Sequence, residues 1–63
     1  MTIDDAARFI AEHSGLVVPV DVVPEVLDRA YRNAARRLHP DSGGDPAMFR
    51  RLTEARDLLR ARP

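Results

Sequence analysis

The sequence predicts an all-α fold: a small helical domain in which two antiparallel helices form a hairpin and a short N-terminal helix packs across it. Three stretches carry apolar residues at helical spacing, and each opens with a pattern typical of a helix start. The valine-rich segment 15–23 is interrupted by a proline and has no second strand candidate to pair with, so we interpret it as an ordered apolar loop. We therefore expect one helical domain over residues 1–63.

The first helix is predicted over residues 3–13. Thr2 can accept a hydrogen bond from the backbone N–H of Asp5, which is the arrangement of a capping box. Apolar residues recur at helical spacing as far as His13, and Gly15 can adopt the left-handed conformation that ends a helix. His13 lies on the apolar face, where we expect it to be packed or half-buried rather than to bind a ligand.

The second helix is predicted over residues 24–38, with a proline at its first position, where the missing N–H costs nothing. It ends near His39, because the residue before a proline is forced out of the helical conformation. One face is apolar and the other is cationic. The basic residues of this helix are Arg29, Arg32 and Arg36 on the polar face and Arg37 at its border.

The third helix is predicted over residues 46–60, where Asp45 is the N-cap and Pro46 occupies the first turn. Two helices joined by the loop 39–45 should pack antiparallel, because a short connection leaves little other choice. The loop is then displayed at one end of the hairpin. The residues that we expect in one buried cluster are Phe9, Leu27, Tyr31, Leu38, Phe49, Leu52 and Leu59.

The charges are unevenly distributed along the chain. Ten arginines balance ten acidic residues, but residues 1–28 hold six acids against one arginine, whereas residues 29–63 hold nine arginines against four acids. Such asymmetry is typical of a surface that meets an acidic partner. The alternative is that these charges belong to ordinary solvated helix faces.

Composition excludes several classes of protein. The chain has no cysteine, so it forms no disulfide framework and no thiolate zinc site. No apolar stretch approaches the ~20 residues of a membrane-spanning helix. The first residues are acidic, whereas a signal peptide begins with positive charge. We therefore expect a cytoplasmic protein without membrane segments.

The residues best suited to a chemical or binding role are His39-Pro40-Asp41, followed by Ser42-Gly43-Gly44. His39 could act as a general base oriented by Asp41, but no nucleophile accompanies it, so we expect neither an enzyme nor a cofactor. The acidic stretch is too short for a calcium-binding EF-hand loop. A purely structural alternative is that Pro40 only ends the helix while Asp41 forms an Asx turn onto the N–H of Gly43.

These residues stand in a recognisable context. Residues 23–41, with Ala30-Tyr31-Arg32 leading without a gap to His39-Pro40-Asp41, resemble the second helix and signature tripeptide of J-domains, the module of DnaJ co-chaperones. Gly43-Gly44-Asp45-Pro46 and Phe49-Arg50-Arg51-Leu52 are similar to the loop and third helix of that family. The resemblance covers about residues 18–61.

The resemblance implies that the loop and the basic helix face dock on a DnaK-type ATPase chaperone of the heat-shock-70 class and stimulate its ATP hydrolysis. The residues that it assigns to partner binding are His39, Pro40, Asp41, Arg29, Arg32, Arg36, Arg37, Tyr31 and Phe49. For Tyr31 and Phe49 a role in the core is an equal alternative. The sequence departs from the family pattern at Asp28 and Ser42, where basic residues are common, and at Arg56, which we expect to disturb the apolar stripe.

Two other functions stay open. A J-like module could serve as an interaction or assembly part of a larger complex without stimulating an ATPase. The arginine face could also bind nucleic acid, because arginine neutralises phosphates. The zero net charge and the lack of interleaved aromatic residues count against nucleic-acid binding.

Overall fold

The computed structural model describes residues 1–62, so Pro63 lies outside the described residues. α1 spans Ile3–Ser14, α2 spans Pro24–Leu38, a short 3-10 helix η1 spans Pro40–Ser42, and α3 spans Pro46–Ala61. No β-strand occurs in this range, which confirms the predicted all-α fold. α1 and α3 each extend one residue beyond the predicted end, and the predicted loop contains the η1 turn.

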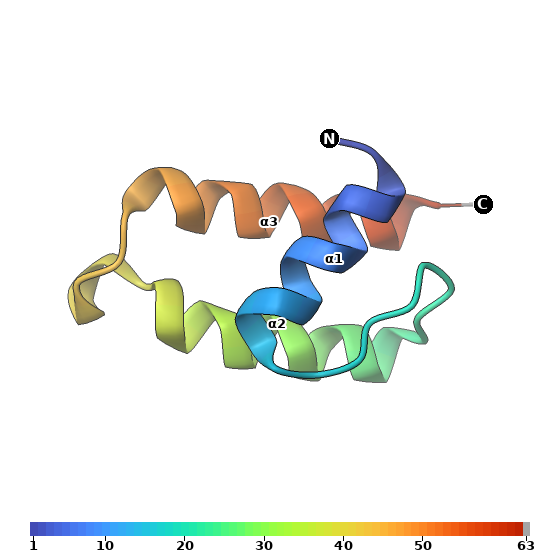
Figure 1. Cartoon of the computed structure of the whole chain (residues 1–63), viewed down its shortest axis with the longest axis horizontal. Helices are drawn as coiled ribbons and strands as arrows, with labels where there is room; N and C mark the ends of the chain where they lie inside the picture. The colour runs from blue at the N-terminus through green and yellow to red at the C-terminus, as the bar shows by residue number, and fades with distance from the viewer. Residues whose placement is uncertain (63) are drawn as a thin grey trace.

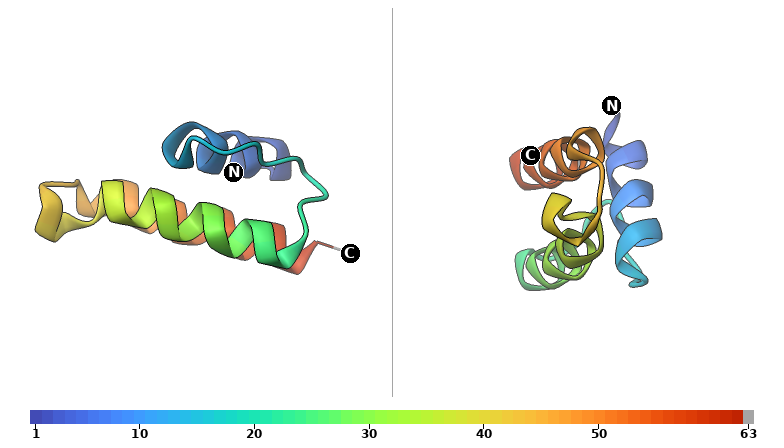
Figure 2. Two further views of the ribbon diagram at one scale, coloured as in Figure 1. Left: turned by 90° about the horizontal axis from the view of Figure 1, so that it is seen from below. Right: turned by 90° about the vertical axis from the view of Figure 1, so that its left-hand side faces the viewer.

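The hairpin and the crossing helix are arranged as expected. α2 and α3 lie side by side and run in opposite directions, with η1 at the end where the chain turns (Figure 1). α1 packs across one face of this pair, as the two rotated views show (Figure 2). The turn end of the hairpin projects beyond α1, so that the residues around η1 are not covered by it.

The start and end of α1 are set by local chemistry. The backbone N–H of Asp5 donates to Thr2 Oγ1 at 3.1 Å, and the Thr2 N–H donates back to the Asp5 carboxylate, which confirms the capping box. Thr2 lowers the pKa of Asp5 through its side chain and its backbone N–H, because hydrogen bonding to the carboxylate favours the ionised form. Gly15 ends the helix with φ at +74°, a conformation that side chains with a Cβ disfavour.

The core lies where α1 contacts both helices of the hairpin. Ile10, Leu27, Leu52 and Leu59 are fully buried, and several alanines between them allow the helices to approach closely. Three further members of the predicted cluster are partly buried against this core: Phe9, Tyr31 and Leu38. The expectation that Phe49 joins the cluster is wrong. It lies in the first turn of α3, next to the loop, where α1 does not cover the hairpin.

The connection between α1 and α2 is the ordered apolar loop that the sequence predicts. Val18 and Val22 are buried, whereas Val17 is 85% exposed. Arg62, just after α3, donates a hydrogen bond from Nη2 to the Val22 carbonyl at 2.9 Å and so fixes the end of this loop. Within residues 1–62, none of the helices has both the length and the apolar composition needed to cross a bilayer.

Candidate functional site

The loop after α2 is organised by His39. Because Pro40 follows it, His39 leaves the helical conformation, with ψ at 134°. Its Nδ1 then accepts a hydrogen bond from the backbone N–H of Asp41 at 3.1 Å, and its carbonyl accepts from Ser42 and Gly44. His39 is therefore the N-cap of η1, and it determines the path of the next five residues.

Two glycines make this tight turn possible. Gly43 has φ at +85° and donates its N–H to the Pro40 carbonyl. That bond replaces the Asx turn of Asp41 onto Gly43 that the structural alternative included, so this detail of the alternative is wrong. Gly44 lies so close to α2 that a Cβ there would overlap the carbonyl group of Leu38. The loop thus folds back tightly against the end of the helix that carries it.

The carboxylate of Asp41 points into solvent. Its side chain is 93% exposed, and Oδ2 lies 3.7 Å from His39 Nδ1. Nδ1 accepts the Asp41 N–H, and the 3.7 Å approach of the carboxylate is longer than a hydrogen bond. The backbone of Asp41 is held in place while its carboxylate remains available to an external hydrogen-bond donor.

Phe49 supports the loop from α3. Its ring meets the imidazole of His39 edge-on, with the ring centroids 5.3 Å apart and the planes at 79°. Asp45 caps α3 by accepting the N–H of Ala47 at 2.9 Å, as predicted, and this holds the first turn of α3 in register with η1. Phe49 is thus a packing partner of His39 rather than a core residue.

The cationic face of α2 leads to this loop. Arg29, Arg32 and Arg36 are all exposed, and we call these three residues the arginine ridge. Arg36 donates to the side chain of Asn33 at 2.6 Å, whereas neither Arg29 nor Arg32 pairs with an acidic group within residues 1–62. Arg37 differs from them, because its Nη1 donates to the carbonyl of His13 in α1.

Tyr31 lies between the two helices of the hairpin. It packs against the core, and its hydroxyl is 3.4 Å from Thr53 Oγ1. The guanidinium of Arg56 lies over its ring, 4.4 Å from the centroid. The sequence led us to expect that Arg56 disturbs the apolar stripe. It does not, because its guanidinium lies against the face of an aromatic ring. Tyr31 has a packing role and has one ring face covered.

Contacts between α2 and α3 were missed in the sequence. Thr53 and Arg56 meet Tyr31, and Arg60 pairs with Asp28. Tyr31 and Thr53 lie at equal distances on either side of the loop 39–45, as the two arms of an antiparallel hairpin require, whereas Arg60 lies about one helical turn farther from the loop than Asp28 does. Counting outward from the loop would have suggested the Tyr31–Thr53 pair, although it could not have supplied its geometry.

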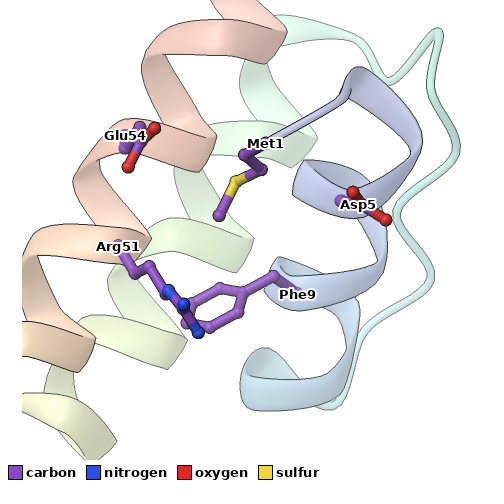
Figure 3. Close-up of a pocket in the computed structure, with 5 residues that line it drawn as sticks. All are labelled: Met1, Asp5, Phe9, Arg51 and Glu54. Atoms are coloured by element: carbon purple, nitrogen blue, oxygen red, sulfur yellow. The ribbon is translucent and has the colours of Figure 1, made fainter.

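One hollow lies beside the loop, lined by Ala35, Arg36, His39 and Ser42, and others lie elsewhere on the surface. A groove of about 420 Å³ between α1 and α3 is lined by Met1, Asp5, Phe9, Arg51 and Glu54. Arg51 points toward the ring of Phe9, and the two carboxylates lie apart from it (Figure 3). The loop residues are not part of this groove. In the part of the chain that the structure describes, no three potential metal-binding side chains come together.

Comparison with known proteins points in one direction. Over 44 residues, which are 70% of this chain and 11% of the relative, the sequence is 50% identical to a DnaJ protein homolog of Atriplex nummularia. It is 48% identical over 44 residues to Chaperone protein dnaJ 2 of Arabidopsis thaliana, covering 70% of this chain and 10% of that protein. Chaperone protein DnaJ 1 of Mycobacterium bovis is 46% identical over 48 residues, which cover 70% of this chain and 12% of that protein.

The chain thus spans about a tenth of the length of the curated relatives it matches. No protein-family model matches it, and no solved structure is significantly similar to it. The relatives and the three-helix architecture agree with the J-domain resemblance of the sequence. The chain is therefore a J-domain-like sequence, related to DnaJ proteins over 70% of its length.

Proposed function

We propose that this chain is a J-domain co-chaperone module that docks on a DnaK-type ATPase chaperone of the heat-shock-70 class and stimulates its ATP hydrolysis. The observation that carries the proposal is the Asp41 carboxylate, which is 93% exposed on a loop with a fixed backbone. Relatives named as chaperone proteins support the choice of partner. In this proposal residues 1–63 form one domain that acts in the cytoplasm, needs no cofactor and performs no catalysis itself.

The arrangement suits a two-step encounter. The arginine ridge attracts an acidic surface of the chaperone and sets the register of the complex, because complementary charge steers association. The ridge ends next to the loop, so docking brings Asp41 to the chaperone. There its carboxylate can accept a charge-assisted hydrogen bond from an arginine of the partner. Such a bond favours whichever conformation of the ATPase offers that arginine, and we infer that this conformation hydrolyses ATP faster.

Single-turnover ATP hydrolysis by a DnaK-type chaperone tests the proposal. We expect the wild-type chain to accelerate hydrolysis and Asp41→Asn, which keeps the shape and removes the charge, to lose about tenfold or more of the stimulation, the equivalent of one charge-assisted hydrogen bond. Asp45→Asn is the matched control, because asparagine caps a helix as well as aspartate does. Absence of stimulation by the wild type, or equal stimulation by Asp41→Asn, contradicts the proposal.

An interaction module without ATPase stimulation is the second candidate. Ser42 favours it, because an exposed uncharged residue follows the tripeptide where the J-domain pattern commonly has a basic residue. The same samples distinguish the two functions when binding is measured by calorimetry. Binding of the chaperone that His39→Gln leaves unchanged, without any acceleration of hydrolysis, supports this second candidate.

A further inference from the structure

Arg37 lies on a different side of α2 from the arginine ridge. A step of four residues turns only about 40° around an α-helix, so Arg32 and Arg36 lie nearly in line, whereas the single step to Arg37 turns about 100°. On that side the C-terminal end of α1 lies over the second half of α2 (Figures 1 and 2). The side chain of Arg37 therefore faces another helix of the same chain.

The guanidinium of Arg37 reaches the end of α1. Its Nη1 donates to the carbonyl oxygen of His13 at 3.3 Å. It also lies against the backbone of Gly15, where a Cβ would be 3.7 Å from Nη1 and 3.8 Å from Nη2. Arg37 thus contacts both the last turn of α1 and the left-handed residue that ends it.

This position satisfies two needs of a helix terminus. The last carbonyls of an α-helix have no partner within the helix, and the carbonyl of His13 is one of these. The C-terminal end of a helix also carries partial negative charge, which a nearby cation stabilises. Gly15 uses its own N–H for the Ala11 carbonyl, so the carbonyl of His13 needs a different donor. Arg37 provides that donor from the neighbouring helix.

We propose that Arg37 is a structural tie between α1 and the end of α2, and that the surface meeting an acidic partner consists of Arg29, Arg32 and Arg36 without Arg37. The second half of this inference rests on the proposed docking function, and the first half does not. The sequence places Arg37 at the border of the polar face, next to the chemically identical Arg36, but does not show what Arg37 contacts. Both side chains are exposed, but Arg36 bonds to Asn33 within its own helix, whereas Arg37 reaches the end of α1.

Two measurements on Arg37→Gln, with Arg32→Gln as the matched control, test the inference. The first is amide hydrogen exchange of Gly15 in the isolated chain. Loss of the tie should raise the exchange rate of the Gly15 amide about fivefold in Arg37→Gln, as expected when one hydrogen bond of ordinary strength is lost. The rate should be unchanged in Arg32→Gln. The second is the salt dependence of the affinity for a DnaK-type chaperone. Arg32→Gln should flatten that dependence, because a docking charge is removed, and Arg37→Gln should keep the wild-type slope.

Each of the two measurements can contradict its own half of the inference. Unchanged exchange of Gly15 in Arg37→Gln overturns the tie, whatever the chaperone does. A salt dependence flattened by Arg37→Gln as much as by Arg32→Gln overturns the exclusion of Arg37 from the docking surface. If the wild-type chain binds no DnaK-type chaperone, the proposed function fails, and the exchange measurement alone then decides whether Arg37 ties α1 to α2.

Discussion

The carboxylate of Asp28 in α2 and the guanidinium of Arg60 in α3 form an ion pair, with Oδ1 and Nη2 2.9 Å apart. Asp28 stands where the J-domain pattern commonly has a basic residue, so its charge should oppose an acidic partner. Arg60 neutralises that charge within the chain. Both side chains are about half exposed, so the pair contributes little to stability, on the order of 0.5 kcal/mol. We expect the pair to matter more for the electrostatic field around the arginine ridge.

Arg60→Gln should therefore slow docking on a DnaK-type chaperone. The change leaves the Asp28 carboxylate unpaired on α2, and the association rate at low salt should fall by about twofold to fivefold because steering weakens. Asp28→Asn in the same chain should restore the rate. Stopped-flow association at low and high salt checks this, and the difference should disappear at high salt. A double variant as slow as Arg60→Gln would show that the charge of Asp28 is irrelevant.

The contact between Tyr31 and Arg56 should stabilise the hairpin. Arg56→Gln keeps much of the side-chain length and removes the cation over the ring, so the free energy of unfolding should fall by about 0.5–1 kcal/mol. In a Tyr31→Leu background, which has no ring, the same change should cost almost nothing. Thermal unfolding of the wild type, the two single variants and the double variant gives the coupling energy of a double-mutant cycle. A coupling of zero would mean that the contact between the Arg56 guanidinium and the Tyr31 ring adds no stability.

The fold could be predicted from the sequence because its determinants are local. The capping box of Thr2, the left-handed Gly15 and Pro40 each set a helix boundary through chemistry within a few residues, and the structure has all three. The displayed loop followed from the short connection between two helices. What failed depends on how helices cover one another. Phe49 shares the apolar stripe of α3, but only the position of α1 in space decides that this stripe is uncovered at its first turn.

The same reason explains what the sequence pattern could not supply at the candidate site. Arg37 and Arg36 differ only by their direction around α2, which matters once the end of α1 is placed. Arg56 looks like a defect in a stripe until Tyr31 is seen beneath it. A sequence pattern assigns a residue to a face, whereas its partner on the next helix depends on the crossing angle and register of the two helices.

Stability of α1 should depend on pH through Asp5. The hydrogen bonds from Thr2 hold the pKa of Asp5 below its ordinary value, so the unfolded chain binds a proton more readily than the folded chain. The stabilising contribution is therefore present above about pH 4 and is lost as the pH falls through the lowered pKa. Urea unfolding from pH 6 to pH 2 checks this.

Thr2→Ala supplies the comparison for Asp5. It removes the side chain that lowers this pKa, so the variant should lose less stability than the wild type over the same acid range. Asp4→Asn, which removes a neighbouring acid outside the capping box, is the control. It should lose as much stability at low pH through Asp5 as the wild type does. Identical pH profiles for Thr2→Ala and the wild type would show that the capping box is not the source.

Gly44→Ala should damage the loop more than Gly43→Ala. A Cβ on Gly44 would overlap the carbonyl of Leu38 and lie 2.9 Å from the carbonyl oxygen of His39, and neither backbone group can move without unwinding the end of α2. A Cβ on Gly43 meets open space, so its cost is the left-handed conformation alone, about 1–2 kcal/mol. Gly43→Asn should cost less than Gly43→Ala, because asparagine tolerates that conformation better.

Urea unfolding of the three variants gives the order of stability, and single-turnover ATPase assays at equal folded concentration give the function. We expect Gly44→Ala to lose most of the stimulation through displacement of Asp41. A Gly44→Ala chain as stable and as active as the wild type would mean that the loop does not fold back tightly onto α2.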